Sequence, residues 1–134
     1  MRLYLDANAI ILAHEGPPSL QRPIIERIIE TCLLPRGIVM TSLLTRMECR
    51  VKPIRDKDIA LLDKYDFMFG TFGLHVIEIS TAIIDRAAIL RAEHRFRTPD
   101  AIHLASAIEN SVDVFLTRDR ALAKCPGVNV ELIN

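Results

Sequence analysis

The feature of the sequence that most constrains its fold is the alternation of short apolar runs with longer helical patterns. Apolar runs at Leu3–Leu5, Ile38–Met40, Leu74–Ile79, Val114–Leu116 and Val128–Ile133 predict strands. One or two predicted helices separate each strand from the next. Strands joined in this way cannot form hairpins, so they predict right-handed crossovers and a parallel sheet that is covered on both faces.

The predicted helices begin and end at recognisable residues. The helix that begins at Leu43 should stop at Pro53, because proline lacks a backbone N–H. Thr98 is expected to cap a helix whose first position is Pro99. In the helix before it, the apolar spacing predicts that Ile84 faces inward. No repeat or linker interrupts the pattern, which predicts one three-layer α/β/α sandwich over residues 1–134 with a central parallel sheet of four to five strands.

Charge and cysteine content limit the function classes that the chain can serve. Lys plus Arg and Asp plus Glu number 17 each, so the formal net charge is zero. This balance argues against avid, non-specific nucleic-acid binding but allows a local basic rim. Cys32, Cys49 and Cys125 fit neither a disulfide framework nor a zinc site, which favours a reducing cytoplasm. Asp6 interrupts the only early apolar run, so no secretory signal is expected. No apolar stretch is long enough to predict a membrane span.

Four acidic residues lie where parallel sheets usually form their sites, beyond the carboxyl ends of the strands. Asp6 directly follows the first predicted strand, and Asp119 follows the Val114–Leu116 strand. Glu48 lies on the helix that leaves the second strand, and Asp100 lies in the first turn of the Pro99 helix. These positions are compatible with a shared acidic pocket. We refer below to Asp6, Glu48, Asp100 and Asp119 as the four acids.

Each acid also has a purely structural interpretation. Asp6 or Asn8 could cap the first helix, and Asp119 could cap the short helix that follows it. Glu48 could complete a capping box with Thr45 or pair with Lys52 one turn further along the same helix. Asp100 could be favoured near a helix N-terminus by the helix dipole. The positions of the acids alone leave both interpretations open.

Four segments of the sequence resemble the motifs of PIN domains. They are LYLDANAI from Leu3, TSLLTRME from Thr41, RTPDAIHLASA from Arg97 and VFLTRDR from Val114. Their order and spacing match the family over the whole chain, and the third segment is the most specific. Within the family, the sequence is most similar to the toxin component of VapBC-type toxin–antitoxin pairs.

The resemblance implies that the four acids surround one or two divalent cations. It also implies supporting roles for Asn8 and Thr117, whose side chains could orient an acid or a metal-bound water. The chain departs from many relatives at Ala7, where a hydroxyl residue is common, and at Arg120, where some relatives carry a further acid. These departures leave the number of ions open.

The chemistry of the four acids favours a hard cation. Two like charges 4 Å apart repel by about 4 kcal/mol at an effective dielectric of 20, so clustered carboxylates need either protons or a cation. Oxygen ligands without histidine or cysteine favour Mg²⁺ or Mn²⁺. Such a site is suited to in-line hydrolysis of RNA phosphodiester bonds. The family resemblance implies 5′-phosphate and 3′-hydroxyl products, while the identity of the RNA stays open.

Basic residues recur beside the four acids. Arg46, Arg97, Arg118 and Arg120 could contact RNA phosphates, although solvated surface positions are the simpler interpretation for many arginines. His103, in the third motif, could be a ligand or proton carrier, but a hydrogen-bonded histidine is the simpler interpretation.

Two other functions compete with the ribonuclease interpretation. A phosphatase of the haloacid dehalogenase type also has an acid after its first strand, but it needs a second Asp where this chain has Asn8. A non-catalytic interaction module could use the same fold. Repulsion among the four acids argues against such a module, because binding alone gives no reason to keep them together.

The resemblance also implies two protein partners. One is a second copy of the chain, with candidate contact surfaces at Phe67–Phe72 and on the predicted helix Pro17–Leu34. The other is a small, partly disordered antitoxin that folds on binding and places an Arg or Lys against the four acids.

Overall fold

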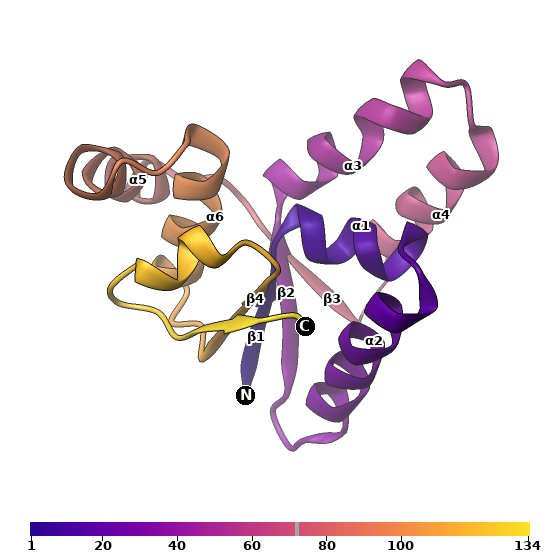
Figure 1. The fold of residues 1–134 in the computed structure, drawn as a ribbon, viewed down its shortest axis with the longest axis horizontal. Helices are drawn as coiled ribbons and strands as arrows, with labels where there is room; N and C mark the ends of the chain where they lie inside the picture. Colours follow the sequence, from indigo (N-terminus) through magenta and orange to yellow (C-terminus); the bar gives the residue numbers. More distant parts are fainter. Residues whose placement is uncertain (72) are drawn as a thin grey trace.

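The computed structural model describes residues 1–71 and 73–134, and its centre is a parallel sheet (Figure 1). The strand order is β3-β2-β1-β4-β5, and every neighbouring pair is parallel. The strands are β1 (Arg2–Leu5), β2 (Ile38–Ser42), β3 (Leu74–Ile77), β4 (Val114–Thr117) and β5 (Val130–Leu132). The helices are α1 (Ala7–Glu15), α2 (Pro18–Leu33), α3 (Leu43–Arg55), α4 (Ile59–Phe69), α5 (Thr81–His94), α6 (Thr98–Glu109) and the 3₁₀ helix η1 (Arg120–Lys124).

Side chains alternate between the two faces of the sheet and give the molecule two core layers. Tyr4 and Phe115 are packed in the layer that α5 and α6 cover. Leu3, Leu5 and Leu116 are packed in the other layer, with residues of α1, α2 and α4. The predicted α/β/α sandwich is therefore confirmed. Because the central strands are buried on both faces, they have the nearly continuous apolar sequences from which the sheet was predicted.

Three local predictions were wrong. Helix α3 continues through Pro53 to Arg55, since a proline in the last turn removes only one backbone hydrogen bond. Thr98 is the first residue of α6 rather than its cap; the cap is Arg97, and its side chain makes no capping hydrogen bond. On α5 the buried face contains Ile83, while Ile84 is exposed, because neighbours on a helix point about a quarter-turn apart.

The strand order determines where a site can form. From β1 the chain moves to β2 and β3 on one side, and it then crosses to β4 and β5 on the other. The strand order therefore reverses between β1 and β4, and parallel sheets form their sites beyond the carboxyl ends of the strands at such a point. At this end of the two strands, Leu5 pairs with Leu116. Asp6 and Thr117 follow these two paired residues directly. No helix in residues 1–71 and 73–134 is long and apolar enough to cross a membrane.

Candidate functional site

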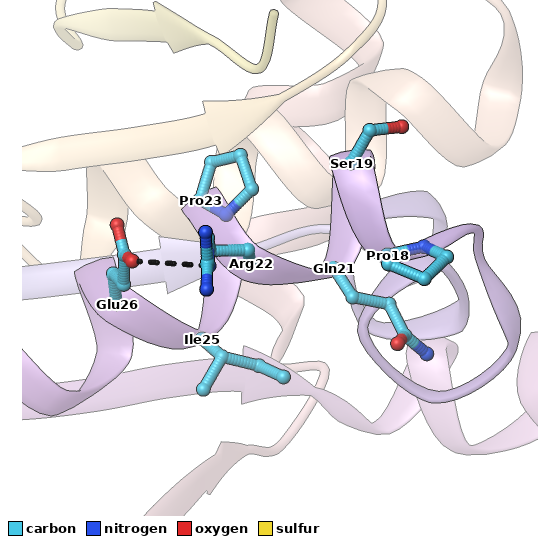
Figure 2. Close-up of a pocket in the computed structure, with 7 residues that line it drawn as sticks. All are labelled: Pro18, Ser19, Gln21, Arg22, Pro23, Ile25 and Glu26. Atoms are coloured by element: carbon cyan, nitrogen blue, oxygen red, sulfur yellow. Dashed lines mark ion pairs between the residues drawn. The ribbon is translucent and has the colours of Figure 1, made fainter.

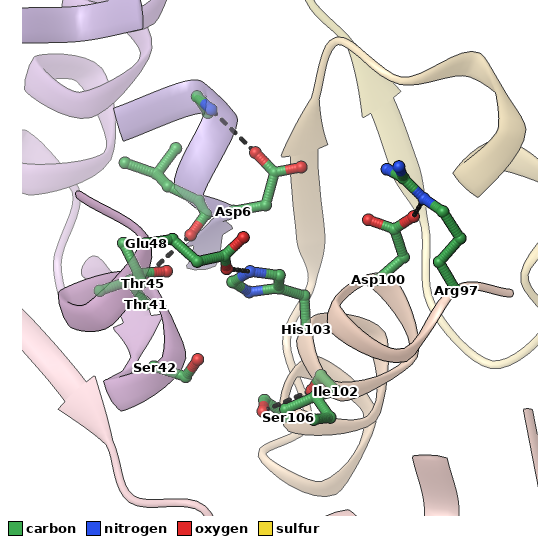
Figure 3. A network of polar contacts seen from close by, with 12 residues as sticks. Asp6, Thr41, Ser42, Thr45, Glu48, Arg97, Asp100, Ile102, His103 and Ser106 are labelled. Carbon is green, nitrogen blue, oxygen red and sulfur yellow. Dashed lines mark hydrogen bonds and ion pairs between the residues drawn. The ribbon is translucent and has the colours of Figure 1, made fainter. Parts of the chain in front are cut away.

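A pocket of about 240 Å³ lies at this edge of the sheet, and all four acids line it. They come from separate segments: the start of α1, the middle of α3, the first turn of α6 and the start of η1. Figure 3 shows Asp6, Glu48 and Asp100 around one space between these elements. The rest of the lining is Ala7, Asn8, Ile11, Arg97 and His103.

Asp6 is the most buried of the four acids, with 5% of its surface exposed. It caps α1, since its Oδ1 accepts a hydrogen bond from the Ala9 amide at 2.8 Å. Its Oδ2 accepts a second bond from the Thr117 hydroxyl at 2.6 Å. Burial raises the pKa of Asp6, although the hydrogen bonds from Thr117 and Ala9 oppose that shift. Asp6 is therefore both a cap and a buried carboxyl group whose negative charge is costly unless a cation approaches.

Thr117 links Asp6 to Asp119 across the end of β4. Its hydroxyl donates to Asp6 and accepts from the Asp119 backbone amide at 3.1 Å. Asp119 in turn caps η1, with its Oδ1 accepting from the Ala121 amide at 2.9 Å. Asn8 lines the pocket and is exposed, but the hydrogen bonds that orient Asp6 come from Ala9 and Thr117.

Glu48 makes neither of its alternative structural contacts and instead approaches His103 of α6. Its Oε1 lies 2.7 Å from His103 Nε2. Lys52, the alternative partner, pairs with Glu15 at 2.8 Å. His103 is only 3% exposed, and its other nitrogen, Nδ1, lies 2.7 Å from the buried Tyr4 hydroxyl. Sequence reasoning did not predict this contact with Glu48.

Arginines stand beside the site, but they differ in their contacts. Arg97 lines the pocket and pairs with Asp100 at 3.1 Å. Arg46 lies 3.8 Å from Asp66 of α4, with its guanidinium over the Phe69 ring. The exposed side chains of Arg118 and Arg120 flank Asp119 in sequence. Arg97 is thus the predicted phosphate contact that the structure places in the pocket lining.

The donor set suits a hard divalent cation, but the side chains do not form a closed ligand shell. Carboxylate oxygens are the ligands that Mg²⁺ and Mn²⁺ prefer, and buried Asp6 makes hydrogen bonds but no ion pair with the part of the chain that the structure describes. However, within the described residues, no three His, Cys, Asp or Glu side chains are grouped closely enough to hold a metal ion. Glu48 is turned toward His103 and Asp100 toward Arg97. The residue types fit an ion, and these side chains would have to adjust to bind it.

A larger hollow, of about 750 Å³, lies along the first half of α2 and offers no comparable chemistry (Figure 2). Its lining comes from a single helix and includes Pro18, Ile25 and one ion pair. That pair, Arg22 with Glu26 at 3.7 Å, is largely exposed and so contributes little. This hollow is a solvated helix surface rather than a second candidate site.

A third hollow, of about 680 Å³, lies between α1, α2 and α4 and is mainly apolar. Its lining includes Ile10, Ile28, Met68 and Phe67, and the Phe67 side chain is 79% exposed. Phe72, which belongs to the same predicted aromatic segment, lies outside the described residues. The hollow is suited to an apolar partner surface rather than to catalysis.

Comparison with known proteins places the fold and its motifs in one family. The PIN domain family matches residues 3–128. A chain of a toxin–antitoxin complex from Klebsiella pneumoniae is 27% identical over 94% of both chains, with a TM-score of 0.73. VapBC2 from Rickettsia felis, bound to a DNA fragment from its promoter, is 16% identical over 100% of both chains, with a TM-score of 0.79.

VapC20 from Mycobacterium tuberculosis, described as a Sarcin-Ricin loop cleaving toxin, gives a TM-score of 0.73 at 15% identity, covering 96% of this chain and 98% of VapC20. No curated protein sequence matches the chain significantly. At identities this low, VapC20 and VapBC2 show a shared fold, whereas the family match spans nearly the whole sequence. The chain therefore belongs to the PIN domain family, and its fold is that of the VapC-type toxins.

Proposed function

We propose that this protein is a Mg²⁺- or Mn²⁺-dependent endoribonuclease and the toxin of a type II toxin–antitoxin pair in the cytoplasm. The observation that carries the proposal is the convergence of the four acids, from four separate segments, on one small pocket. Family membership supports the same function, as does the fold shared with VapC20, which is described as a Sarcin-Ricin loop cleaving toxin.

The four acids would hold one or two ions, and each residue of the site would then have a distinct task. When bound, Mg²⁺ or Mn²⁺ supplies charge neutralisation at the phosphate and activation of water. Thr117 would keep Asp6 oriented through the hydrogen bond that it already makes. Arg97 could exchange Asp100 for an RNA phosphate, because its side chain is exposed. No side chain is required as a covalent nucleophile.

The direct test is cleavage of RNA by the purified chain with Mn²⁺ or Mg²⁺. Asp100→Asn should abolish cleavage while leaving the fold intact, because the substitution removes the charge and keeps the shape. Cleavage by Asp100→Asn at the wild-type rate would contradict the site assignment. Sequencing the cleaved ends after brief expression would then identify the RNA substrate.

A non-catalytic interaction module is the second candidate, and one observation favours it. Glu48 and Asp100 already have partners inside the molecule, and the Arg97 guanidinium offsets the charge of Asp100 without any ion. An interaction module should show no response to Mn²⁺, whereas a nuclease site should bind the ion. The structure adds no support for the phosphatase alternative, because Asn8 occupies the position where that chemistry needs a second Asp.

We further propose an antitoxin partner that binds the apolar hollow between α1, α2 and α4 and places a basic side chain against the four acids. Residues of α1 line part of the hollow, and Asp6 caps the N-terminus of the same helix. One antitoxin segment lying along α1 could therefore cover the hollow and reach the four acids. Expression of the chain alone should slow growth, and co-expression of the neighbouring small open reading frame should restore it. Normal growth at high expression of the active chain would contradict the toxin assignment.

A homodimer is also proposed, because apolar side chains are exposed at helical spacing on two helices. They are Ile25, Ile29 and Leu33 on α2, and Leu43, Met47 and Val51 on α3. The α2 surface was predicted from the sequence, whereas the α3 surface was not. Light scattering at micromolar concentration should give twice the mass of the chain, and a monomer mass would contradict the proposal.

A further inference from the structure

His103 is a buried polar residue to which the proposed chemistry assigns no task. It lies on α6 one turn after Asp100, and its surroundings on that helix are apolar and buried. Both of its ring nitrogens have partners at 2.7 Å, Tyr4 on one side and Glu48 on the other. No ring nitrogen is therefore left for RNA, which excludes a direct catalytic role in this arrangement.

The two contacts determine which nitrogen carries a proton. An ionised carboxylate can only accept hydrogen bonds, so His103 Nε2 must donate to Glu48. At Nδ1, the Tyr4 hydroxyl can either donate or accept, and the Ser42 hydroxyl 3.0 Å away can supply the complementary bond. Burial raises the pKa of Tyr4, so the hydroxyl keeps its proton. With Glu48 ionised, His103 presents an N–H to Glu48 in every consistent pattern.

The support behind His103 is rigid. The Tyr4 ring is fully buried and stacks on Phe115, with 5.1 Å between ring centroids and 14° between ring planes. The same Tyr4 ring meets the His103 ring edge-on at 5.9 Å. Glu48, in contrast, is a long side chain at the pocket wall and is partly exposed. The buried Tyr4–His103 pair thus meets one oxygen of a partly exposed acid.

We propose that His103, held in place by Tyr4, is a positioning residue that fixes Glu48 so that its second carboxylate oxygen is available to a bound divalent cation. Figure 3 shows that only one Glu48 oxygen faces His103, while the other points into the space toward Asp6. Through this contact, α6 contributes twice to the site, once by carrying Asp100 and once by holding an acid of α3. The proposal rests on the metal site of the proposed function.

The test is Mn²⁺ affinity, measured by electron paramagnetic resonance or calorimetry on the folded full-length chain. His103→Leu should weaken Mn²⁺ binding about 10- to 100-fold, as expected when the support of a metal-binding side chain is removed. His103→Gln should recover most of the loss, because its amide can donate from nearly the same place. Ser106→Ala is the matched control, since Ser106 is equally buried on α6 but its hydroxyl bonds to the Ile102 carbonyl of the same helix. This variant should keep wild-type affinity.

A thermodynamic cycle separates positioning from general destabilisation. If His103 acts through Glu48, His103→Leu should cause little further loss of affinity in a Glu48→Gln background. Wild-type affinity in His103→Leu, or equal losses with and without the Glu48 carboxylate, would overturn the proposal. Should His103→Leu fail to fold, Tyr4→Phe decides, because it keeps the stacked ring and loses only the hydroxyl. A folded Tyr4→Phe with wild-type affinity would overturn the proposal.

Different results would contradict the metal site and the positioning role of His103. If the wild-type chain shows no Mn²⁺ binding, the metal site itself is wrong and the positioning role falls with it. If the wild-type chain binds Mn²⁺ and Asp6→Asn does not, while His103→Leu binds normally, only the positioning role is wrong.

Discussion

The two carboxyl groups at the ends of α1 are in opposite electrostatic situations. Asp6, at the N-terminus, is almost fully buried, and within the described residues its carboxylate takes hydrogen bonds from Thr117 and a backbone amide. Burial raises its pKa more than these hydrogen bonds lower it. Glu15, at the C-terminus, bonds to Lys52 and to the buried Tyr65 hydroxyl. Partial burial would raise the pKa of Glu15, but these hydrogen bonds and the Lys52 charge outweigh it and lower the pKa.

This difference separates a structural carboxylate from one that is available for binding. Glu15 joins α1 to α3 and α4, and a cation within the protein already balances its charge. The buried charge of Asp6 is not balanced in this way, and the remaining three acids line the same pocket. A protein that keeps a costly carboxylate gains from it only if something outside the chain supplies the opposite charge.

The largest expected difference between the two acids is in RNA cleavage. Asp6→Asn should lower the Mn²⁺-dependent rate by about 100-fold or more, because it removes ligand charge from the site. Glu15→Gln is the matched control and should cleave at nearly the wild-type rate. Single-turnover kinetics with excess enzyme would measure the cleavage rates of both variants. A similar loss of rate in the two variants would contradict the proposed difference between Asp6 and Glu15.

Thermal stability with added metal should show the next largest effect. Mn²⁺ at about 100 times its dissociation constant adds about 2.7 kcal/mol to the free energy of unfolding. The wild-type Tm should therefore rise by several degrees, and a chelator should reverse the rise. Asp6→Asn should lose most of this response, and Glu15→Gln should keep it. An unchanged wild-type Tm in saturating Mn²⁺ would favour the non-catalytic module.

The Glu15 cluster should be sensitive to loss of the Tyr65 hydroxyl. Tyr65→Phe should reduce the free energy of unfolding by about 1.5 kcal/mol at neutral pH, because it removes a hydrogen bond to a charged group. The lowered pKa of Glu15 means that its contribution is present above the unfolded pKa and is lost as pH falls through the folded pKa. Urea unfolding at several pH values should show that the difference in unfolding free energy between the wild type and Tyr65→Phe shrinks in acid. A difference that stays constant with pH would contradict the role of ionised Glu15.

The smallest effect concerns Asp6 in the metal-free protein and has the opposite sign. Because the folded state raises the pKa of Asp6, stability from this group is lost as pH rises through the folded value. Asp6→Asn should therefore raise Tm by a few degrees at neutral pH in the presence of a chelator. The gain should vanish below about pH 4, where the acid is protonated in both states. A lower Tm for Asp6→Asn at neutral pH would show that its hydrogen bonds outweigh its charge.

The sequence by itself determined the sheet and the approximate place of the site. Strand positions can be predicted from apolar runs. Asp6 directly follows β1 and Asp119 lies two residues after β4, so their location at the carboxyl edge needs only local information. Local signals were weaker at helix ends. Pro53 and Thr98 were misassigned there because packing tolerates a lost hydrogen bond or a missing cap.

Only the tertiary structure decided which partner each acid takes. Glu48 and His103 are 55 positions apart, and Tyr4 and His103 are 99 apart. Neither contact can therefore be predicted from the spacing of neighbouring residues in the sequence. The one available signal was the place of His103 on the apolar face of α6, one turn after Asp100. Partner choice depends on how α3 and α6 pack across the sheet edge. That packing is set by the whole core, and the residues adjacent to each acid do not determine it.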